Sequence, residues 1–343
     1  MELTFLGTSA GIPTRRRNVS ALAVRRGGTW DLFDCGEGTQ HQLLRTPLSL
    51  SKLRRVFVSH LHGDHCFGLF GLLASRSTDS TVGPLTVFGP RGLGHMIDVV
   101  LRTSASHLTY ELEVVEVADE GGPLTVDDLE VRAIPLSHRV TSFAWSMIEP
   151  DRPGSFDVET ARSLGVPDGP LFGRLQRGES VTLDDGSVVE PAAVVGPVRP
   201  GRHVVVAGDG RDPATMLDRS GGADVVVHEA TFTEDVLERL GDDRGHSTAA
   251  RIADAAERHG VGTLVLTHFS ARYSGSATPP PPDTTAGRPT ASPPPDTAPG
   301  TSVDELADEA RRHFTGRLHL ADDFDRLTFG PDGALDTVER TDA

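Results

Sequence analysis

Four side chains that can bind a metal ion are concentrated in the six residues 60–65, which read His-Leu-His-Gly-Asp-His. An apolar run at 56–58 precedes them and predicts a buried strand. Side chains on an extended backbone repeat every two residues, so the first two histidines point the same way, and the aspartate and third histidine can turn toward a neighbouring point. Imidazole and carboxylate ligands without thiolate favour zinc, with manganese or iron as alternatives. The spacing therefore predicts that two adjacent metal ions are bound by His60, His62, Asp64 and His65.

Three more potential ligands follow apolar runs elsewhere in the chain. His138 comes after the run at 131–134, Asp209 after 204–207, and His268 after 263–267. Open α/β sheets place their sites beyond the carboxyl ends of strands. Each of these residues alone could as readily be structural. Together with the first cluster they make a set of seven side chains for a dinuclear site, in which Asp209 could bridge the two ions.

Strand-like runs alternate with helical patterns along most of the chain, which predicts an α/β protein. Strands are expected at 2–6, 21–24, 29–33, 55–59, 85–88, 112–117, 129–134 and 317–321, and helices at 39–45, from about 65, and at 303–314.

Two stretches interrupt this alternation. Residues 150–200 are rich in Pro and Gly with little continuous core, which favours an arm over a second core domain. Residues 274–300 are a Pro-, Thr- and Ser-rich stretch that predicts an extended, mobile loop, tolerated rather than functional.

Composition excludes several classes of protein. The 343 residues are 37% hydrophobic and 24% charged, enough for a globular core. No run of about 18 apolar residues is present, and no secretory signal precedes the first strand, so neither a membrane span nor export is expected. Two cysteines, Cys35 and Cys66, cannot form a disulfide scaffold. We expect a cytoplasmic protein.

Net charge taken alone argues against a nucleic-acid partner. Lys plus Arg is 33 and Asp plus Glu is 49, a balance of −16, whereas nucleic-acid binders usually carry a basic footprint. Arginines nevertheless cluster at 15–17, 25–26 and 54–55, and net charge does not forbid a locally positive groove.

On these motifs the sequence resembles the metallo-β-lactamase fold and, within it, the ribonuclease Z family of tRNA 3′-end endonucleases. The resemblance covers almost the whole chain. The histidine motif defines only the superfamily. The combination of His-Glu-Ala-Thr at 228–231, His-Ser-Thr at 246–248 and Ser-Ala-Arg-Tyr at 270–273 is far more specific and points to the tRNA enzymes. Other matching segments lie at 5–13, 17–18, 33–40, 108–110, 137–138 and 208–209.

The resemblance implies a four-layer αβ/βα sandwich with a protruding flexible arm, the arm being 150–200 within a single domain 1–343. It implies a homodimer that acts on precursor tRNA, not DNA, and holds two zinc ions per chain. One ion would be bound by His60, His62, His138 and Asp209, and the other by Asp64, His65, Asp209 and His268. Substrate contacts are expected from Arg17, Asn18, Arg272 and Tyr273, and in the arm from Gly165, Pro167, Gly169 and Pro170.

The expected reaction is hydrolysis of a phosphodiester that leaves a 3′-hydroxyl on the tRNA. Two metal ions can activate a water molecule, and Asp64 could hold or deprotonate it. The departing ribose oxygen is strongly basic, so a proton donor should matter. His246 is the candidate and Glu229 its partner, although His246 could instead lie beside a helix N-cap at Ser247. Gly210 departs from the family pattern, which has a hydroxyl residue after the aspartate.

Two other functions remain open. A small-molecule phosphodiesterase or other hydrolase of the same fold would use the same metals without needing the arm or the pair Glu229 and His246. A non-catalytic RNA-binding module would need a decayed site, but all seven ligand positions are filled.

Overall fold

The chain forms two compact units in the computed structural model, which describes residues 1–79, 81–241, 244–273, 302–330 and 335–340. One unit comprises Met1–Leu124, Val131–Met147 and His203–Ala343, and the other comprises Thr125–Glu130 and Ile148–Arg202. The predicted proline-rich loop at 274–300 lies outside the described residues.

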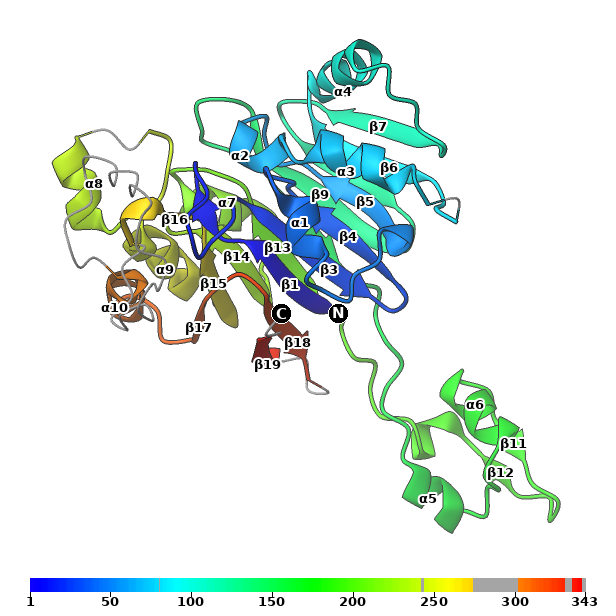
Figure 1. The fold of residues 1–343 in the computed structure, drawn as a ribbon. Helices are drawn as coiled ribbons and strands as arrows, with labels where there is room; N and C mark the ends of the chain where they lie inside the picture. The colour runs from blue at the N-terminus through cyan, green and yellow to red at the C-terminus, as the bar shows by residue number, and fades with distance from the viewer. Residues whose placement is uncertain (80, 242–243, 274–301, 331–334, 341–343) are drawn as a thin grey trace, which may run out of the picture. The chain divides into compact units, whose positions relative to one another are not determined.

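The first unit is built on two large mixed sheets (Figure 1). The first has the strand order β19-β18-β1-β3-β4-β5-β6-β7. Strands β4 to β7 are parallel, whereas β1, β3, β18 and β19 pair antiparallel. Its strands are β1 Glu2–Gly7, β3 Ala21–Arg26, β4 Thr29–Phe33, β5 Leu53–Phe57, β6 Leu85–Pro90, β7 Leu112–Val117, β18 Asp325–Phe329 and β19 Leu335–Arg340.

The second sheet has the order β17-β15-β14-β13-β10-β9-β8. Strands β13, β14, β15 and β17 run parallel, so their carboxyl ends reach the same edge of the sheet. Its strands are β8 Gly122–Val126, β9 Leu129–Leu136, β10 Ser142–Ile148, β13 His203–Ala207, β14 Val225–Glu229, β15 Thr263–Thr267 and β17 Arg317–Leu320. A short pair outside both sheets joins β2 Ser9–Ala10 to β16 Phe269–Ser270.

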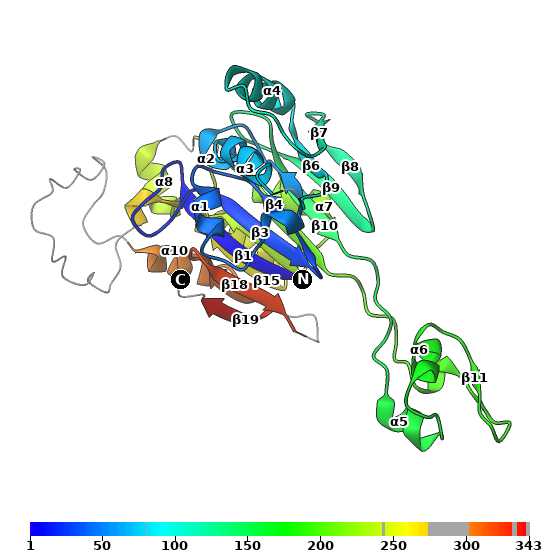
Figure 2. The same cartoon turned by 45° about the vertical axis from the view of Figure 1, so that its right-hand side comes forward.

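Helices cover the outer face of each sheet, which gives four layers (Figures 1 and 2). Buried residues of α1, α3 and α4 pack on the first sheet, and those of α7, α8, α9 and α10 on the second. The helices of this unit are α1 Thr39–Leu43, η1 Leu50–Lys52, α2 Gly63–Cys66, α3 Leu69–Arg76, α4 Leu93–Thr103, α7 Pro213–Ser220, α8 Glu234–Leu240, α9 Ala249–Arg258, η3 Ala271–Tyr273 and α10 Val303–Arg311. No helix among the described residues is both long and apolar enough to span a bilayer.

Aromatic side chains fill the space between the sheets. Phe57 of β5 stacks on Phe33 and Phe88 at 4.9 Å and meets Trp145 of β10 at 5.2 Å. Trp145 also lies 5.7 Å from Phe143. Such ring pairs bury a large apolar area with defined geometry, so they fix how the two sheets face each other.

The second unit has a small core of its own. Six buried apolar residues form it: Ala161, Val166, Leu175, Val181, Val189 and Val194. Its elements are α5 Val158–Ser163, α6 Pro170–Gln176, β11 Val181–Thr182, β12 Val188–Val189 and η2 Pro191–Ala193. At its base, Arg152 and Arg199 exchange two backbone hydrogen bonds of 2.8 and 2.9 Å. The short pieces expected at 150–200 thus pack on one another around a small core that the sequence analysis did not identify.

The four-layer α/β sandwich expected from the sequence is present, and most expected strands and helices appear within a few residues of their expected ends. The sequence analysis did not identify β8, β10, β18, β19 or α4. The helix near His65 is divided into α2 and α3. The N-cap of α9 is Thr248, whose side chain accepts a hydrogen bond from the Arg251 amide, and not Ser247.

Candidate metal centre

Ring nitrogens and carboxylate oxygens from both sheets converge at one place in the first unit. His60 and His62 follow β5, and Asp64 and His65 lie on the short helix α2. His138 follows β9, Asp209 follows β13 and His268 follows β15. The seven residues that the sequence predicts as ligands thus come together from segments up to about two hundred residues apart.

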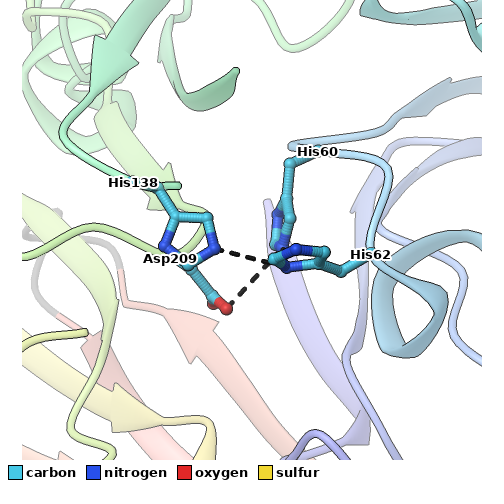
Figure 3. Close-up of side chains that lie close together, drawn as sticks. All are labelled: His60, His62, His138 and Asp209. Carbon is cyan, nitrogen blue, oxygen red and sulfur yellow. Dashed lines mark hydrogen bonds and ion pairs between the residues drawn. The ribbon is translucent and has the colours of Figure 1, made fainter. Parts of the chain in front are cut away.

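Three groups of donors in the described segments lie close enough to hold an ion, and one of them consists of Asp209, Glu229, His246 and His268. The other two contain only residues that the sequence predicts as ligands. One consists of His60, His62, His138 and Asp209, and the other of Asp64, His65 and His268; within each group the donor atoms all lie within 4.8 Å of one another. Figure 3 shows the first group, with His60 and His62 facing His138 and Asp209. The Oδ1 atom of Asp209 lies 3.4 Å from the Nε2 atoms of both His65 and His268, so this carboxylate reaches both groups.

Hydrogen bonds on the outer side of the rings orient the donor nitrogens. The Nδ1 atom of His65 donates to Asp34 Oδ2 at 2.6 Å, and that of His138 donates to the Gly245 carbonyl at 2.8 Å. The Nδ1 atoms of His60 and His268 each lie 3.0 Å from a hydroxyl, that of Ser59 or Thr231. Each of these four contacts leaves Nε2 for the interior of the site.

The sequence analysis did not single out these outer partners as part of the site. Asp34 also accepts hydrogen bonds from the Ser59 amide and hydroxyl, at 2.7 and 2.8 Å. It therefore holds both His65 and the residue directly before His60. Its backbone has a positive φ of 56°. The signal available was its position directly after the strand at 29–33, the same strand-end placement that identified the ligands.

The backbone at position 245 requires a glycine. Its φ is +87°, and a Cβ atom there would lie 2.5 Å from the Nδ1 atom of His138. Only a residue without a side chain allows the backbone carbonyl to approach this ring.

The electrostatics of the site call for positive charge. Burial would raise the pKa of Asp64 and Asp209, but the neighbouring histidines hold the pKa of both well below the usual range. Burial would lower the pKa of His65, yet Asp209 and Asp34 hold it well above its ordinary value. Burial lowers the pKa of His60, His62 and His138. Two carboxylates with neutral imidazoles beside them suit a divalent cation.

The distances between ring nitrogens agree with this fit. The Nδ1 atom of His62 lies 3.0 Å from His60 Nε2 and 3.3 Å from His138 Nε2, and one proton could bridge only one of these gaps. The Nε2 atoms of His65 and His268 are 3.2 Å apart. A cation between such atoms replaces repulsion between lone pairs with attraction to each of them. The donor set therefore fits metal ions, with imidazole and carboxylate ligands that favour zinc.

Glu229 and His246 lie beside the two groups. The Nδ1 atom of His246 donates to Glu229 Oε2 at 3.0 Å and lies 3.6 Å from Asp209. Burial would lower the pKa of His246, but Glu229 and Asp209 raise it to about 9. Burial would raise the pKa of Glu229, but His246 lowers it. The other Glu229 oxygen accepts the Gly210 amide at 2.8 Å.

That last bond does not depend on which side chain is present at position 210. The residue after Asp209 contributes its backbone N–H to Glu229, and this needs no side chain. A Cβ atom at Gly210 would lie 3.0 Å from the Cβ atom of Leu136, so space for a larger residue is tight here.

The predicted substrate contacts near the amino terminus are engaged within the protein. The Arg17 side chain is 11% exposed; its Nη1 donates to Thr8 Oγ1 and to the Ala321 carbonyl, each at 2.7 Å, and lies 3.3 Å from Asp322. Asn18 donates its amide to Asp323 and its side-chain N–H to the Glu37 carbonyl. The loop they anchor places the Gly11 amide 2.8 Å from Asp64 Oδ2.

Tyr273 is likewise buried, with 2% of its surface exposed, and its hydroxyl accepts the Thr233 amide at 2.9 Å. Arg272 is half-buried over the Phe232 ring. These positions favour a structural part for Tyr273 over a direct contact with phosphate. Gly165, Pro167, Gly169 and Pro170 are exposed, in the connection between α5 and α6 and at the first residue of α6.

Comparisons with known proteins agree with this fold. A metallo-β-lactamase fold protein of Bacillus subtilis, YhfI, superposes with a TM-score of 0.60 over 95% of this chain and 98% of that chain, at 18% identity. Human tRNase Z, short form, superposes with a TM-score of 0.62 over 96% of this chain and 99% of that chain, at 25% identity. A family model described as "Anti-Pycsar protein Apyc1" matches residues 1–148. The sandwich and its strand-end histidines thus define a hydrolase of the metallo-β-lactamase fold.

Sequence relatives identify the family within this class of hydrolases. Ribonuclease Z of Pseudomonas putida is 44% identical over 98% of this chain and 100% of its own length, and that of Brevibacillus brevis is 48% identical over 80% of this chain and 86% of its own. The chain belongs to the ribonuclease Z family, metal-dependent hydrolases of RNA phosphodiester bonds. The resemblance expected from the sequence motifs is confirmed.

Removal of a predicted ligand should lower metal content without unfolding the protein. His62→Ala and Asp209→Ala each delete one donor, so metal affinity should fall by more than the roughly 10–100-fold that loss of an outer-shell partner costs. Metal per chain, measured by plasma mass spectrometry after dialysis, checks this. His95→Ala, an exposed histidine on α4, is the control. Unchanged metal content in both ligand variants would contradict the dinuclear assignment.

Arg17→Ala should destabilise the protein by about 1–3 kcal/mol, because it removes a mostly buried cation and leaves Asp322 without that ion pair. Chemical denaturation measures the change. Arg15→Ala, an exposed neighbour in the same loop, should leave the free energy of unfolding unchanged. Equal stability of the two variants would instead favour Arg17 as a solvent-facing RNA contact.

Proposed function

We propose that the protein is a zinc-dependent endoribonuclease that removes the 3′ trailer from precursor tRNA and leaves a 3′-hydroxyl on the tRNA. The observation that carries the proposal is the convergence of the seven predicted ligands beside the Glu229–His246 pair. Relatives named ribonuclease Z, at 43–48% identity over most of the chain, support the substrate.

Each residue of the site has a separate part in this proposal. His60, His62 and His138 hold one ion, Asp64, His65 and His268 hold the other, and Asp209 touches both groups. Bound there, divalent cations neutralise phosphate charge and lower the pKa of water. Manganese or iron could replace zinc, since the donor set contains no thiolate.

Asp64 is held in place by the Gly11 amide at its Oδ2 atom, so its carboxylate is oriented before substrate arrives. A carboxylate fixed in this way can hold the attacking water in position or accept a proton from it.

His246 is the proton donor for the departing ribose oxygen. Glu229 occupies its Nδ1 atom, so Nε2 is the nitrogen left to deliver a proton. The His246 ring lies 5.4 Å from the His138 ring and 5.5 Å from the His268 ring, which places it next to both groups of ligands. Glu229 in turn is fixed by the Gly210 amide and the Thr231 hydroxyl, so the pair is oriented from both ends.

The unit at 148–202 is the arm that clamps the tRNA body. Several of its arginines are paired with its own acidic side chains, as in Arg162 with Asp168 and Arg174 with Glu179. Its contact with RNA therefore depends on shape and on the exposed Gly/Pro turn between α5 and α6 as well as on charge. A homodimer and a cytoplasmic location complete the proposal.

The test is incubation of the metal-loaded protein with a 3′-extended precursor tRNA, with the cut mapped relative to the discriminator base. Cleavage on its 3′ side, with a 3′-hydroxyl on the tRNA, is expected. Failure to cleave precursor tRNA while a small phosphodiester is hydrolysed rapidly would favour a small-molecule phosphodiesterase instead.

His246→Ala should retain metal but lose about 10²–10⁴-fold in the rate of precursor cleavage, the usual contribution of a proton donor. Single-turnover rates and metal content measured on the same preparation check both halves. Loss of metal in this variant would show that His246 is structural.

Replacing residues 154–197 with a short Gly/Ser linker should leave the first unit folded, because the backbone pair between Arg152 and Arg199 already brings the two ends together. Cleavage of precursor tRNA should fall about 100-fold, as expected for loss of a second binding contact, whereas hydrolysis of bis(p-nitrophenyl) phosphate should be unchanged. Full tRNA cleavage by a folded deletion variant would refute the clamping role.

A further inference from the structure

One buried carboxylate on α10 joins the starts of two other helices. Glu309 is 6% exposed and accepts the Glu234 amide at 2.9 Å on Oε1 and the Ala250 amide at 3.0 Å on Oε2. Glu234 is the first residue of α8, and Ala250 is the second residue of α9. Each oxygen serves one helix, so the carboxylate fixes the distance between the two.

Both helices begin directly after residues of the site. Thr231, whose hydroxyl contacts Glu229 and His268, lies three residues before α8 begins. His246 lies three residues before α9 begins. The two lead-in segments run side by side, since Phe232 and Thr248 form a parallel bridge and the Ala249 amide donates to the Phe232 carbonyl at 3.0 Å.

Two other side chains also brace this junction, and one of them, Glu234 on α8, reaches α9. Tyr273 accepts the Thr233 amide, and Glu234 accepts the Thr248 hydroxyl at 2.7 Å and Arg251 at 2.6 Å. Within the part of the chain that the structure describes, Glu309 is the carboxylate that accepts amides of both helices from a third element.

We propose that Glu309 is a positioning residue for the proton donor, setting His246 against Glu229 by fixing the segment that carries His246 and the segment that directly follows Glu229. The proposal rests on the proposed function, because it acts through the donor part of His246. Glu309 touches neither substrate nor the ligand groups; its effect passes through the backbone of α8 and α9.

The chemistry of the contact requires a carboxylate of this length. Two N–H groups point at two oxygens, and both are acceptors. In Glu309→Gln one oxygen becomes an NH₂ donor facing another donor, so one bond is lost while shape and volume are kept. In Glu309→Asp both acceptors remain, but the side chain is one methylene shorter.

The kinetic test compares two substrates that differ in their leaving group. In precursor tRNA the leaving group is a strongly basic ribose oxygen, which needs a proton. In bis(p-nitrophenyl) phosphate the leaving group is a weakly basic phenolate, which does not need one. In Glu309→Gln, kcat for precursor tRNA should fall about 10–100-fold at unchanged KM and metal content, since small displacements of a catalytic group cost this much. Hydrolysis of bis(p-nitrophenyl) phosphate should stay at the wild-type rate. Asp308→Asn, an exposed neighbour on the same helix, is the matched control and should change neither rate.

A spectroscopic measurement tests the positioning without any substrate. The imidazole N–H resonance of His246 in the metal-loaded protein is identified by its loss in His246→Ala. It should shift or broaden in Glu309→Gln and remain unchanged in Asp308→Asn. Where Glu309→Gln fails to fold, Glu309→Asp provides both readings, with a smaller change in the same direction.

The outcomes separate the two proposals. An unchanged His246 resonance together with unchanged rates would overturn the role of Glu309, and so would an equal loss on both substrates, which marks general damage to the site. Wild-type protein that leaves precursor tRNA uncut would overturn the proposed function, and the resonance would still decide whether Glu309 positions His246.

Discussion

The convergence of facing lone pairs, in an arrangement that fits a cation, is the constraint that the surrounding parts of this molecule satisfy. Five imidazoles and two aspartates meet with donor atoms 3.0–3.7 Å apart. Protons between these atoms can relieve only part of the repulsion between their lone pairs. The outer hydrogen bonds to Asp34, Ser59, Gly245 and Thr231 make sense in this light, because each keeps a proton on the far side of a ring. The packed sandwich is rigid enough to keep these donor side chains close together.

Neither sheet could form the centre alone. The first supplies the histidine motif after β5, and the second supplies His138, Asp209 and His268. The packing of Phe57 against Trp145 sets how these two contributions meet. Packing between the sheets therefore acts on the chemistry directly, since a change in sheet spacing changes every distance across the two donor groups.

The ligands were predictable because their signal is local: a short motif and three strand ends, each readable within a few residues. The parts that the sequence analysis missed depend on partners far away in the chain. Arg17 is anchored by residues near 321, and Tyr273 is anchored by Thr233. The residues adjacent to Arg17 and Tyr273 in the sequence do not indicate these partners. The core at 161–194 was missed for a related reason, since its apolar residues are scattered singly among Pro and Gly and show no continuous period. In the sequence, Glu309 is one of several acidic residues on an amphipathic helix. Its contacts with α8 and α9 become visible only in the folded structure.

One stretch of backbone serves two chemical tasks at adjacent residues. The carbonyl of Gly245 orients His138, and the next side chain along is His246. Under the proposed function, a rotation of this peptide would alter cation retention and proton delivery in the same movement. The two properties cannot drift independently as sequences diverge, and a substrate that shifts this peptide on docking acts on both together.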